Sequence, residues 1–568
     1  MELFLYDVFY YKIFPILDNH EMLTVLALNK VIREKYWKKY CEFKSLGGIH
    51  YYNFLKLPLI LRKNLIHVKI PECDVDMLPT LSNVTKISFT NCYNDALTDN
   101  ISILTNLTCV SFACCYNQEI NYLSTLINLT HLSFGYDYNK PIDALSILTN
   151  LTHLKFGKQF NCSINPLATL SKLTTLIFGG LFNPKDNFDF NREPYDDMYK
   201  FIPYTAFNQP IDILSKLTKL TYLDLGYNFN HPINALSAST NLKKLNLGHK
   251  FNQSIDILIK LTNLKNLAFG DDFDQPITSL ITLTNLNMLK FGDKFNHSID
   301  SVSTLTNLKK LFFGHNFNHQ INSIFVLTNL TTLVFGYKFN QSIDHLDALT
   351  NLTNLVFGEN FNQSVNHLDT LTNLTRLHFN EKFDQPVYQL SKLTKLEELV
   401  FRGLFNQSVD ALSTLTNLTW LNLEYDFNQS INNLSTLTNL TRLNIGFLFN
   451  QSVDALSTLT NLTMLAFREK FNQPINNLST LTNLTYLRLG DYFNQSIDSL
   501  SKLTNLTYLE IGYDFNHSID SLSTLVNLQD LIIINPEFDK SITPLLHLTK
   551  LKNIVSGRNS NSNLFING

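Results

Sequence analysis

Apolar and polar positions along this chain follow a period of 22 residues over almost the whole length. One repeat, FNQSVDALSTLTNLTWLNLEYD, runs from Phe405 to Asp426, and the next begins at Phe427. With the phenylalanine numbered position 1, apolar residues fall at positions 1, 5, 8, 11, 14, 17 and 19. A fixed period of this kind predicts a solenoid, in which each coil buries its apolar side chains against its neighbours and none is stable alone.

Two short elements are predicted within each repeat. Positions 16 to 19 alternate, so that Leu421 and Leu423 point inward while Trp420 and Asn422 face out, as in a short strand. Positions 8 to 15 have a three-residue leucine spacing, which predicts a helical or 3₁₀ turn on the opposite, convex side. Position 20 is often glycine, which suits a turn with positive φ. These glycines include Gly226, Gly248, Gly270 and Gly292.

The L-x-x-L-x-x-L-x-x-L-x-[LF] pattern resembles a leucine-rich repeat, and its LTNLT segment is similar to the 22-residue internalin subtype. The turn asparagine stands at position 2, after a phenylalanine, and the signature [FY]-N-x-[PS]-[IV] resembles the FNIP repeats of social amoebae and of giant viruses that infect amoebae. About twenty copies lie between Tyr93 and Phe538. We expect the aromatic at position 1, such as Phe405, to plug the stack, and Asn406 after it to join a buried hydrogen-bonded ladder.

We therefore predict an α/β repeat fold, a leucine-rich-repeat-like right-handed solenoid of about twenty 22-residue repeats with a small α-helical domain at its N-terminus. The expected division of the chain follows the places where the pattern starts, breaks and stops. It consists of a helical segment (1–46), a cap with degenerate repeats (47–92), repeats (93–183), an insertion loop (184–206), repeats (207–555) and a polar tail (556–568).

The N-terminal segment resembles an F-box. Residues 13–41 read IFPILDNHEMLTVLALNKVIREKYWKKYC, with an Ile-Phe-x-x-Leu helix end, an Asp-led turn and a leucine-rich second helix. The resemblance implies docking on a Skp-type adaptor of a cullin-based ubiquitin ligase. The residues that it assigns to the adaptor contact are Leu5, Ile13, Phe14, Leu17, Leu23 and Leu26.

This segment departs from the F-box pattern at several places. Tyr6 stands where the motif has proline, Val8 stands where glutamate is common, and Pro15 would end or kink the first helix near Phe14. The alternative is a helical cap that shields the first apolar coil, which a solenoid needs in any case. The two interpretations differ in function, because a cap carries no link to ubiquitin.

Composition narrows the classes of partner and compartment. Lys+Arg 45 against Asp+Glu 48 gives a net charge of −3, without the basic stripe that neutralises phosphates, so we expect no nucleic-acid partner. The sequence has no run of 18 apolar residues, which predicts no membrane span, and its first residues lack the basic region of a signal peptide. Asn-Leu-Thr sequons in nearly every repeat would invite a glycan on each coil in a secretory compartment. We therefore predict a cytoplasmic protein, in the host cytoplasm if it is viral.

Motifs for catalysis and metal binding are missing from the sequence. No G-x-x-x-x-G-K-[ST], G-x-S-x-G or H-E-x-x-H occurs, and carboxylates are scattered without a paired constellation. His315 and His319 are four residues apart, but His319 merely replaces the usual glutamine at position 3, as His231, His297 and His517 do in their repeats. We expect no enzyme activity, no cofactor and no metal site.

A binding surface is expected where positions 16 and 18 project from the concave face. Trp, Tyr and Arg, the residue types that dominate binding hot spots, gather there in the C-terminal repeats. The alternative is that unconstrained surface positions vary at random. The predicted substrate-binding patch consists of Trp420, Arg442, Tyr486, Arg488, Tyr508 and Glu510. With the F-box-like segment, it predicts the substrate-recognition subunit of an SCF-type ligase; a stand-alone protein-binding scaffold is the alternative.

Overall fold

A computed structural model describes residues 49–50, 67–70, 84–89, 101–179 and 205–556. The chain divides into two compact units, Met1–Gly270 and Asp271–Gly568. The predicted F-box-like segment, with Leu5, Ile13, Phe14, Leu17, Leu23 and Leu26, lies outside the described residues. The same holds for most of the 184–206 insertion and for nearly all of the polar tail.

The described part of the first unit contains ten parallel strands, each paired with the next along the chain. The strands are β1 (Ile49–His50), β2 (His67–Ile70), β3 (Lys86–Phe89), β4 (Cys109–Ser111), β5 (His131–Ser133), β6 (His153–Phe156), β7 (Thr175–Phe178), β8 (Tyr222–Asp224), β9 (Lys244–Asn246) and β10 (Asn266–Ala268). Short 3₁₀ helices alternate with them. These are η4 (Asn121–Thr125), η5 (Asp143–Ile147), η6 (Asn165–Thr169), η7 (Asp212–Lys216), η8 (Asn234–Ala238) and η9 (Asp256–Lys260).

The second unit continues the same alternation, and its strands also pair in parallel with the next along the chain. The strands are β11 (Met288–Lys290), β12 (Lys310–Phe312), β13 (Thr332–Val334), β14 (Asn354–Val356), β15 (Arg376–Phe379), β16 (Glu398–Phe401), β17 (Trp420–Leu423), β18 (Arg442–Ile445), β19 (Met464–Phe467), β20 (Tyr486–Arg488), β21 (Tyr508–Ile511), β22 (Asp530–Ile533) and β23 (Asn553–Ser556).

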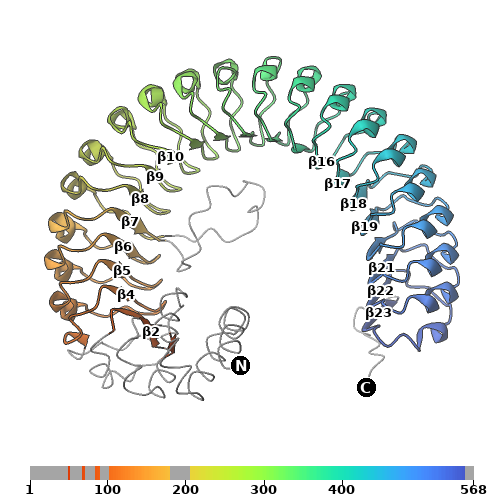
Figure 1. Cartoon of the computed structure of the whole chain (residues 1–568), viewed down its shortest axis with the longest axis horizontal. Coiled ribbons are helices and arrows are strands. Elements are labelled where there is room, and N and C mark those ends of the chain that lie inside the picture. Colours follow the sequence, from red (N-terminus) through yellow and green to blue (C-terminus); the bar gives the residue numbers. More distant parts are fainter. Residues whose placement is uncertain (1–48, 51–66, 71–83, 90–100, 180–204, 557–568) are drawn as a thin grey trace, which may run out of the picture. The chain divides into compact units, whose positions relative to one another are not determined.

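The 3₁₀ helices of this unit begin with η10 just before β11 and end with η22 before β23. They are η10 (Thr278–Thr282), η11 (Asp300–Thr304), η12 (Asn322–Ile324), η13 (Leu346–Ala348), η14 (Asn366–Thr370), η15 (Tyr388–Lys392), η16 (Asp410–Thr414), η17 (Asn432–Thr436), η18 (Asp454–Thr458), η19 (Asn476–Thr480), η20 (Asp498–Lys502), η21 (Asp520–Thr524) and η22 (Thr543–Leu545). Within each unit the strands lie on the inner side of the curve and the 3₁₀ helices on the outer side (Figure 1). This arrangement confirms the leucine-rich-repeat-like solenoid.

The strands stack in register, which brings equivalent positions of successive repeats together. Leu421 is aligned with Leu399 on one side and Leu443 on the other, and all three are fully buried. The predicted strand is therefore confirmed. Asn422, expected to face out, is only 3% exposed, because the aligned neighbours of position 18 cover it from both sides.

The 3₁₀ helix covers positions 6 to 10, earlier and shorter than the predicted 8 to 15. Its start is fixed by Ser408, whose hydroxyl accepts a hydrogen bond from the Asp410 N–H at 3.2 Å. Farther on, the Ser413 hydroxyl donates to the Asp410 carbonyl at 2.8 Å. The helix ends at Leu415, which leaves the helical region with ψ of 54°. The three-residue leucine spacing continues beyond the helix because one further turn follows, in which the Leu418 N–H donates to the Leu415 carbonyl.

Within each unit the aromatic at position 1 forms a buried column, as predicted. The rings of Phe405 and Phe427 lie 6.2 Å apart and nearly parallel, and both side chains are fully buried. A second ring at position 19 packs against this column, with the Phe401 and Phe405 centroids at 3.9 Å. The inserted phenylalanine thus replaces an aliphatic seam with stacked rings of large buried area.

The asparagine ladder exists, but its members are not buried as expected. Asn406 Oδ1 accepts hydrogen bonds from the Asn428 N–H at 2.9 Å and from Gln429 Nε2 at 3.1 Å. Both asparagines are half-buried, because the ladder lies at the edge of the coil and not inside it. Glutamine at position 3 therefore shares the acceptor with the backbone of its own repeat, which links adjacent coils by two hydrogen bonds.

Glycine occurs at position 20 for two separate physical reasons. Gly226 and Gly248 adopt the positive φ that was predicted, at 76° and 84°. Gly270 and Gly292 are not among the described glycines with positive φ, so the expectation is wrong there. A Cβ on Gly270 would lie 1.7 Å from the carbonyl oxygen of Gly248, so the close approach of these two coils leaves no room for a side chain at residue 270.

Truncation of an inward leucine should open the stack locally. Leu421→Ala removes fully buried methyl groups between two aligned leucines and should cost about 2 to 5 kcal/mol. We expect hydrogen-exchange protection to fall in β16, β17 and β18. Trp420→Ala, one residue away and pointing outward, is the matched control and should keep that protection. Parental protection in Leu421→Ala would contradict the assigned core.

We predict that the stability of the first unit depends on pH because the Asp224 carboxylate is buried. Its carboxylate is 4% exposed and accepts the Gly226 N–H at 3.0 Å, and burial raises its pKa to about 6. Since the unfolded value is about 3.9, the folded state holds the extra proton, and stability falls as pH rises between about 4 and 6.

We expect Asp224→Asn to remove this pH dependence, with a gain on the order of 2 kcal/mol at pH 7. Asn246, in the same slot of the next repeat, already accepts the Gly248 N–H at 3.2 Å, so the amide fits. Thermal unfolding of parent and variant at pH 5 and pH 7.5 measures the effect. Equal pH slopes in the two proteins would show that Asp224 does not titrate in this window.

Candidate functional site

The six residues of the predicted patch all lie on the strand face of the second unit, but in two clusters. Trp420 and Arg442 are aligned on β17 and β18. The other four residues are aligned in pairs on β20 and β21: Tyr486 with Tyr508 and Arg488 with Glu510. Met464 and Ala466 of β19 separate the two clusters. Arg442 is exposed and the other five side chains are half-buried, so solvent can reach all six.

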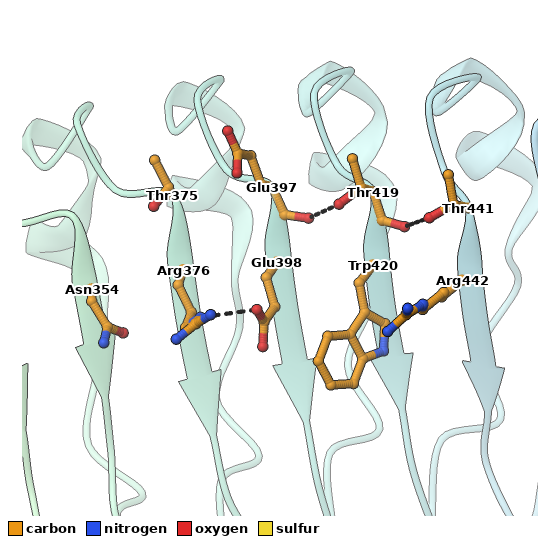
Figure 2. A pocket seen from close by; sticks show the side chains of 9 residues that line it. All are labelled: Asn354, Thr375, Arg376, Glu397, Glu398, Thr419, Trp420, Thr441 and Arg442. Atoms are coloured by element: carbon orange, nitrogen blue, oxygen red, sulfur yellow. Dashed lines mark hydrogen bonds and ion pairs between the residues drawn. The ribbon is translucent and has the colours of Figure 1, made fainter. Parts of the chain in front are cut away.

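The first cluster lines a shallow concavity of about 420 Å³. Trp420 and Arg442 contribute to it, and sequence reasoning missed the remaining residues (Figure 2). Figure 2 shows the Arg442 side chain extending from its strand toward that of Trp420. The other lining residues are Asn354, Thr375, Arg376, Glu397, Glu398, Thr419 and Thr441.

One wall of the concavity is a row of threonines at position 15. The Thr419 hydroxyl donates to the Glu397 carbonyl at 3.0 Å, and the Thr441 hydroxyl donates to the Thr419 carbonyl at 2.9 Å. Each hydroxyl has one proton, which is used in this ladder. The wall therefore offers a ligand methyl groups and hydroxyl acceptors, and no further hydroxyl donor from these two residues.

Glu398 lies on β16, next to Trp420 of β17, and forms ion pairs with two basic side chains. Its carboxylate lies 2.9 Å from Arg376 Nε and 2.6 Å from His378 Nε2. Burial acts to raise the pKa of Glu398, but the hydrogen bond and charge of His378 and the charge of Arg376 outweigh it, so the pKa falls below its ordinary value. Glu398 is therefore anionic near neutral pH and already neutralised within the protein.

Arg442 has a different environment. Its side chain is exposed, and among the described residues no carboxylate lies within ion-pair distance of it. Trp420 beside it is half-buried, with its ring open to the concavity. A large aromatic surface next to an unpaired guanidinium is a combination that favours a partner with apolar and anionic groups.

The charged and phenolic groups of the second cluster pair with one another, although Arg488 Nε makes no hydrogen bond of good geometry. The rings of Tyr486 and Tyr508 stack at 4.5 Å, the Tyr508 hydroxyl donates to Glu510 Oε2 at 2.6 Å, and Arg488 Nε lies 3.0 Å from Glu510 Oε1. Burial and the Glu510 hydrogen bond raise the pKa of Tyr508. The phenol thus stays protonated, and the cluster presents stacked ring surface with little free charge.

The described residues contain no group of three or more His, Cys, Asp or Glu side chains placed to hold a metal ion. His319 instead bonds the Asn296 carbonyl at 2.8 Å, and His315 stacks on Tyr337. Within the same described ranges, no helix has both the length and the apolar character needed to cross a membrane.

Comparison with known proteins identifies the fold. No known protein family and no curated protein matches the sequence. Among solved structures, the chain is similar to CroV588, a circular leucine-rich-repeat protein from a giant virus (CroV), with 28% identity and a TM-score of 0.60 over 90% of this chain and 78% of that one.

Two internalins of Listeria monocytogenes also match. InlF has 21% identity and a TM-score of 0.45 over 57% of this chain and 89% of its own, and InlJ has 19% and 0.44 over 56% and 69%. With the coil geometry and the likeness to CroV588, the chain is a leucine-rich-repeat-like solenoid. The finer resemblance to FNIP repeats and to an F-box stays a prediction.

Proposed function

We propose that this protein is a non-catalytic scaffold that holds a protein partner on the strand face of its second unit, centred on Trp420. The observation that carries the proposal is the half-buried Trp420 ring beside the exposed, unpaired Arg442 in an open concavity. Trp and Arg are the residue types that contribute most to protein interfaces. The solenoid supports this role because outward positions can vary without loss of the leucine core.

We further propose that the N-terminal segment recruits a Skp-type adaptor, which would make the chain a substrate-recognition subunit of an SCF-type ligase in the cytoplasm, the host cytoplasm if it is viral. The sequence of residues 13–41 supports this proposal, with Phe14, Leu23 and Leu26 in the expected slots. The alternative is a scaffold without a ubiquitin link, in which the same residues only cap the first coil.

Binding of a purified Skp-type adaptor to the full chain separates these alternatives. We expect the parent to retain the adaptor and Leu23→Asp with Leu26→Asp to lose it, because charges in an apolar contact leave it unpaired and desolvated. Circular dichroism serves as the control for folding of the repeats. If the parent retains no adaptor, or if the folded double variant retains it fully, the ligase role is excluded and the plain scaffold remains.

Trp420→Ala tests the binding face itself. A central aromatic of an interface typically contributes about 2 kcal/mol or more, so affinity for a partner isolated with the parent should fall about thirtyfold. Thr332→Ala, at the same position of β13, is the matched control and should bind as the parent. Normal binding by Trp420→Ala would place the partner elsewhere on the molecule.

A further inference from the structure

A row of exposed apolar side chains borders the same coils at the carboxyl ends of their strands. Leu404, Tyr425, Phe447 and Leu448 occupy positions 21 and 22 of three consecutive repeats and are between 39% and 57% exposed. The Tyr425 and Phe447 rings lie 6.4 Å apart. We call these four residues the apolar rim. Contiguous exposed apolar surface of this kind marks an interaction site more often than single exposed leucines do.

The rim is held in a fixed and locally strained conformation. Tyr425 has φ of 50°, and it is the only described non-glycine residue with positive φ. The same position of the preceding repeat is Gly403, with φ of 69°. Glycine adopts this conformation freely, whereas an aromatic residue does so at a cost that points to function. The Leu448 N–H, which donates to the Tyr425 carbonyl at 2.9 Å, holds the turn in place.

Between the rim and Trp420 lies a floor of small polar side chains. Asn422 and Asn444 are aligned on β17 and β18, and within the described structure the Oδ1 atom of each accepts no hydrogen bond. Asn422 Nδ2 donates to Glu424 Oε1 at 2.9 Å, which fixes its amide orientation. Buried acceptors of this kind are costly unless a donor reaches them. Both atoms lie below the surface, so the floor itself offers a partner no exposed acceptor.

The charges on the strand face determine which sign of charge its partner should carry. From β11 to β22, positions 16 and 18 carry five cations, Lys290, Lys310, Arg376, Arg442 and Arg488, against the three carboxylates Glu398, Glu510 and Asp530. Glu398 and Glu510 are paired within the protein and at most 15% exposed. The accessible charge of this face is therefore positive, although the whole chain carries a net charge of −3. An anionic partner is complementary to it.

We infer that the partner of this face is an extended acidic segment of another protein, which pairs a carboxylate with Arg442 and places apolar side chains on the rim. The inference rests on the proposed function. Position 16 and the rim are five residues apart, and the strand ends at position 19, so about 16 Å is the upper limit of their separation. The acidic and apolar side chains of the segment are therefore no more than about six residues apart. Exposed Glu397, at position 15, repels a carboxylate from the opposite direction and sets the orientation.

The test is selection of binders to the full chain from a displayed library of random twelve-residue peptides. We expect enriched peptides to carry Asp or Glu within about six residues of an aromatic or aliphatic residue. One such synthetic peptide is then measured by fluorescence anisotropy. Enrichment of basic or uncharged peptides, or of none, would overturn the inference.

Two variants of the chain examine the two ends of the surface. Arg442→Glu and Tyr425→Gly should each weaken the selected peptide about tenfold or more, and glycine suits the φ of position 425, so this fold is retained. The matched controls are Lys310→Glu, at position 16 of β12, and Tyr337→Ala, at position 21 of an earlier repeat; both should bind as the parent. Changing the acidic residue of the peptide to its amide should cost less than Arg442→Glu, because it removes the attraction without adding repulsion, and the two changes combined should cost no more than Arg442→Glu alone.

The outcomes separate this inference from the proposed function. If Trp420→Ala loses the peptide while Arg442→Glu and Tyr425→Gly keep it, the acidic-segment inference fails and the binding face stands. If all three variants bind as the parent, both fail. Concentration-dependent self-association of the parent that Tyr425→Gly abolishes would assign the rim to a second copy of the chain and overturn the inference.

Discussion

Stacking in register between coils is the interaction on which every other feature of this protein depends. A 22-residue coil is too short to bury its own leucines, so each one is covered by the equivalent leucine of the coils before and after it. The same alignment places ring on ring, as in Phe405 and Phe427, and amide on backbone, as in Asn406 and Asn428. A residue that fits the stack once therefore fits it in every repeat, which explains why the sequence varies so little at these positions.

The period predicted the features that repeat and missed those that depend on the spacing between coils. Strand positions and the buried phenylalanine column follow from apolar spacing alone. The burial of Asn422 does not, because it comes from neighbours 22 residues away, which a one-repeat view treats as solvent. Gly270 shows the same limit: its lack of a side chain reflects a carbonyl of the preceding coil, and positive φ is not the reason.

The candidate site was predicted in part for a related reason. Trp420 and Arg442 occupy variable outward slots and contrast with the bland residues of earlier repeats, so the sequence alone pointed to them. The ion pair of Arg376 with Glu398 was missed, since it joins residues 22 apart whose contact depends on register. The rim had little signal in the sequence, because tyrosine recurs at position 21, as in Tyr227 and Tyr337, and only the adjacent Leu404 and Leu448 distinguish these coils.

Inward positions form the packed core and outward positions do not, which affects how this chain could acquire partners. Inward residues are fixed by two neighbours, so a change there must be accommodated on both sides. Outward residues at positions 16 and 21 contribute little to that packing, and Tyr425 even keeps an unfavourable φ that glycine would relieve. The coil that holds Tyr425 keeps a strained backbone, and the arginine beside it has no ion-pair partner. The other coils secure the fold, so selection for binding could keep both features in this one.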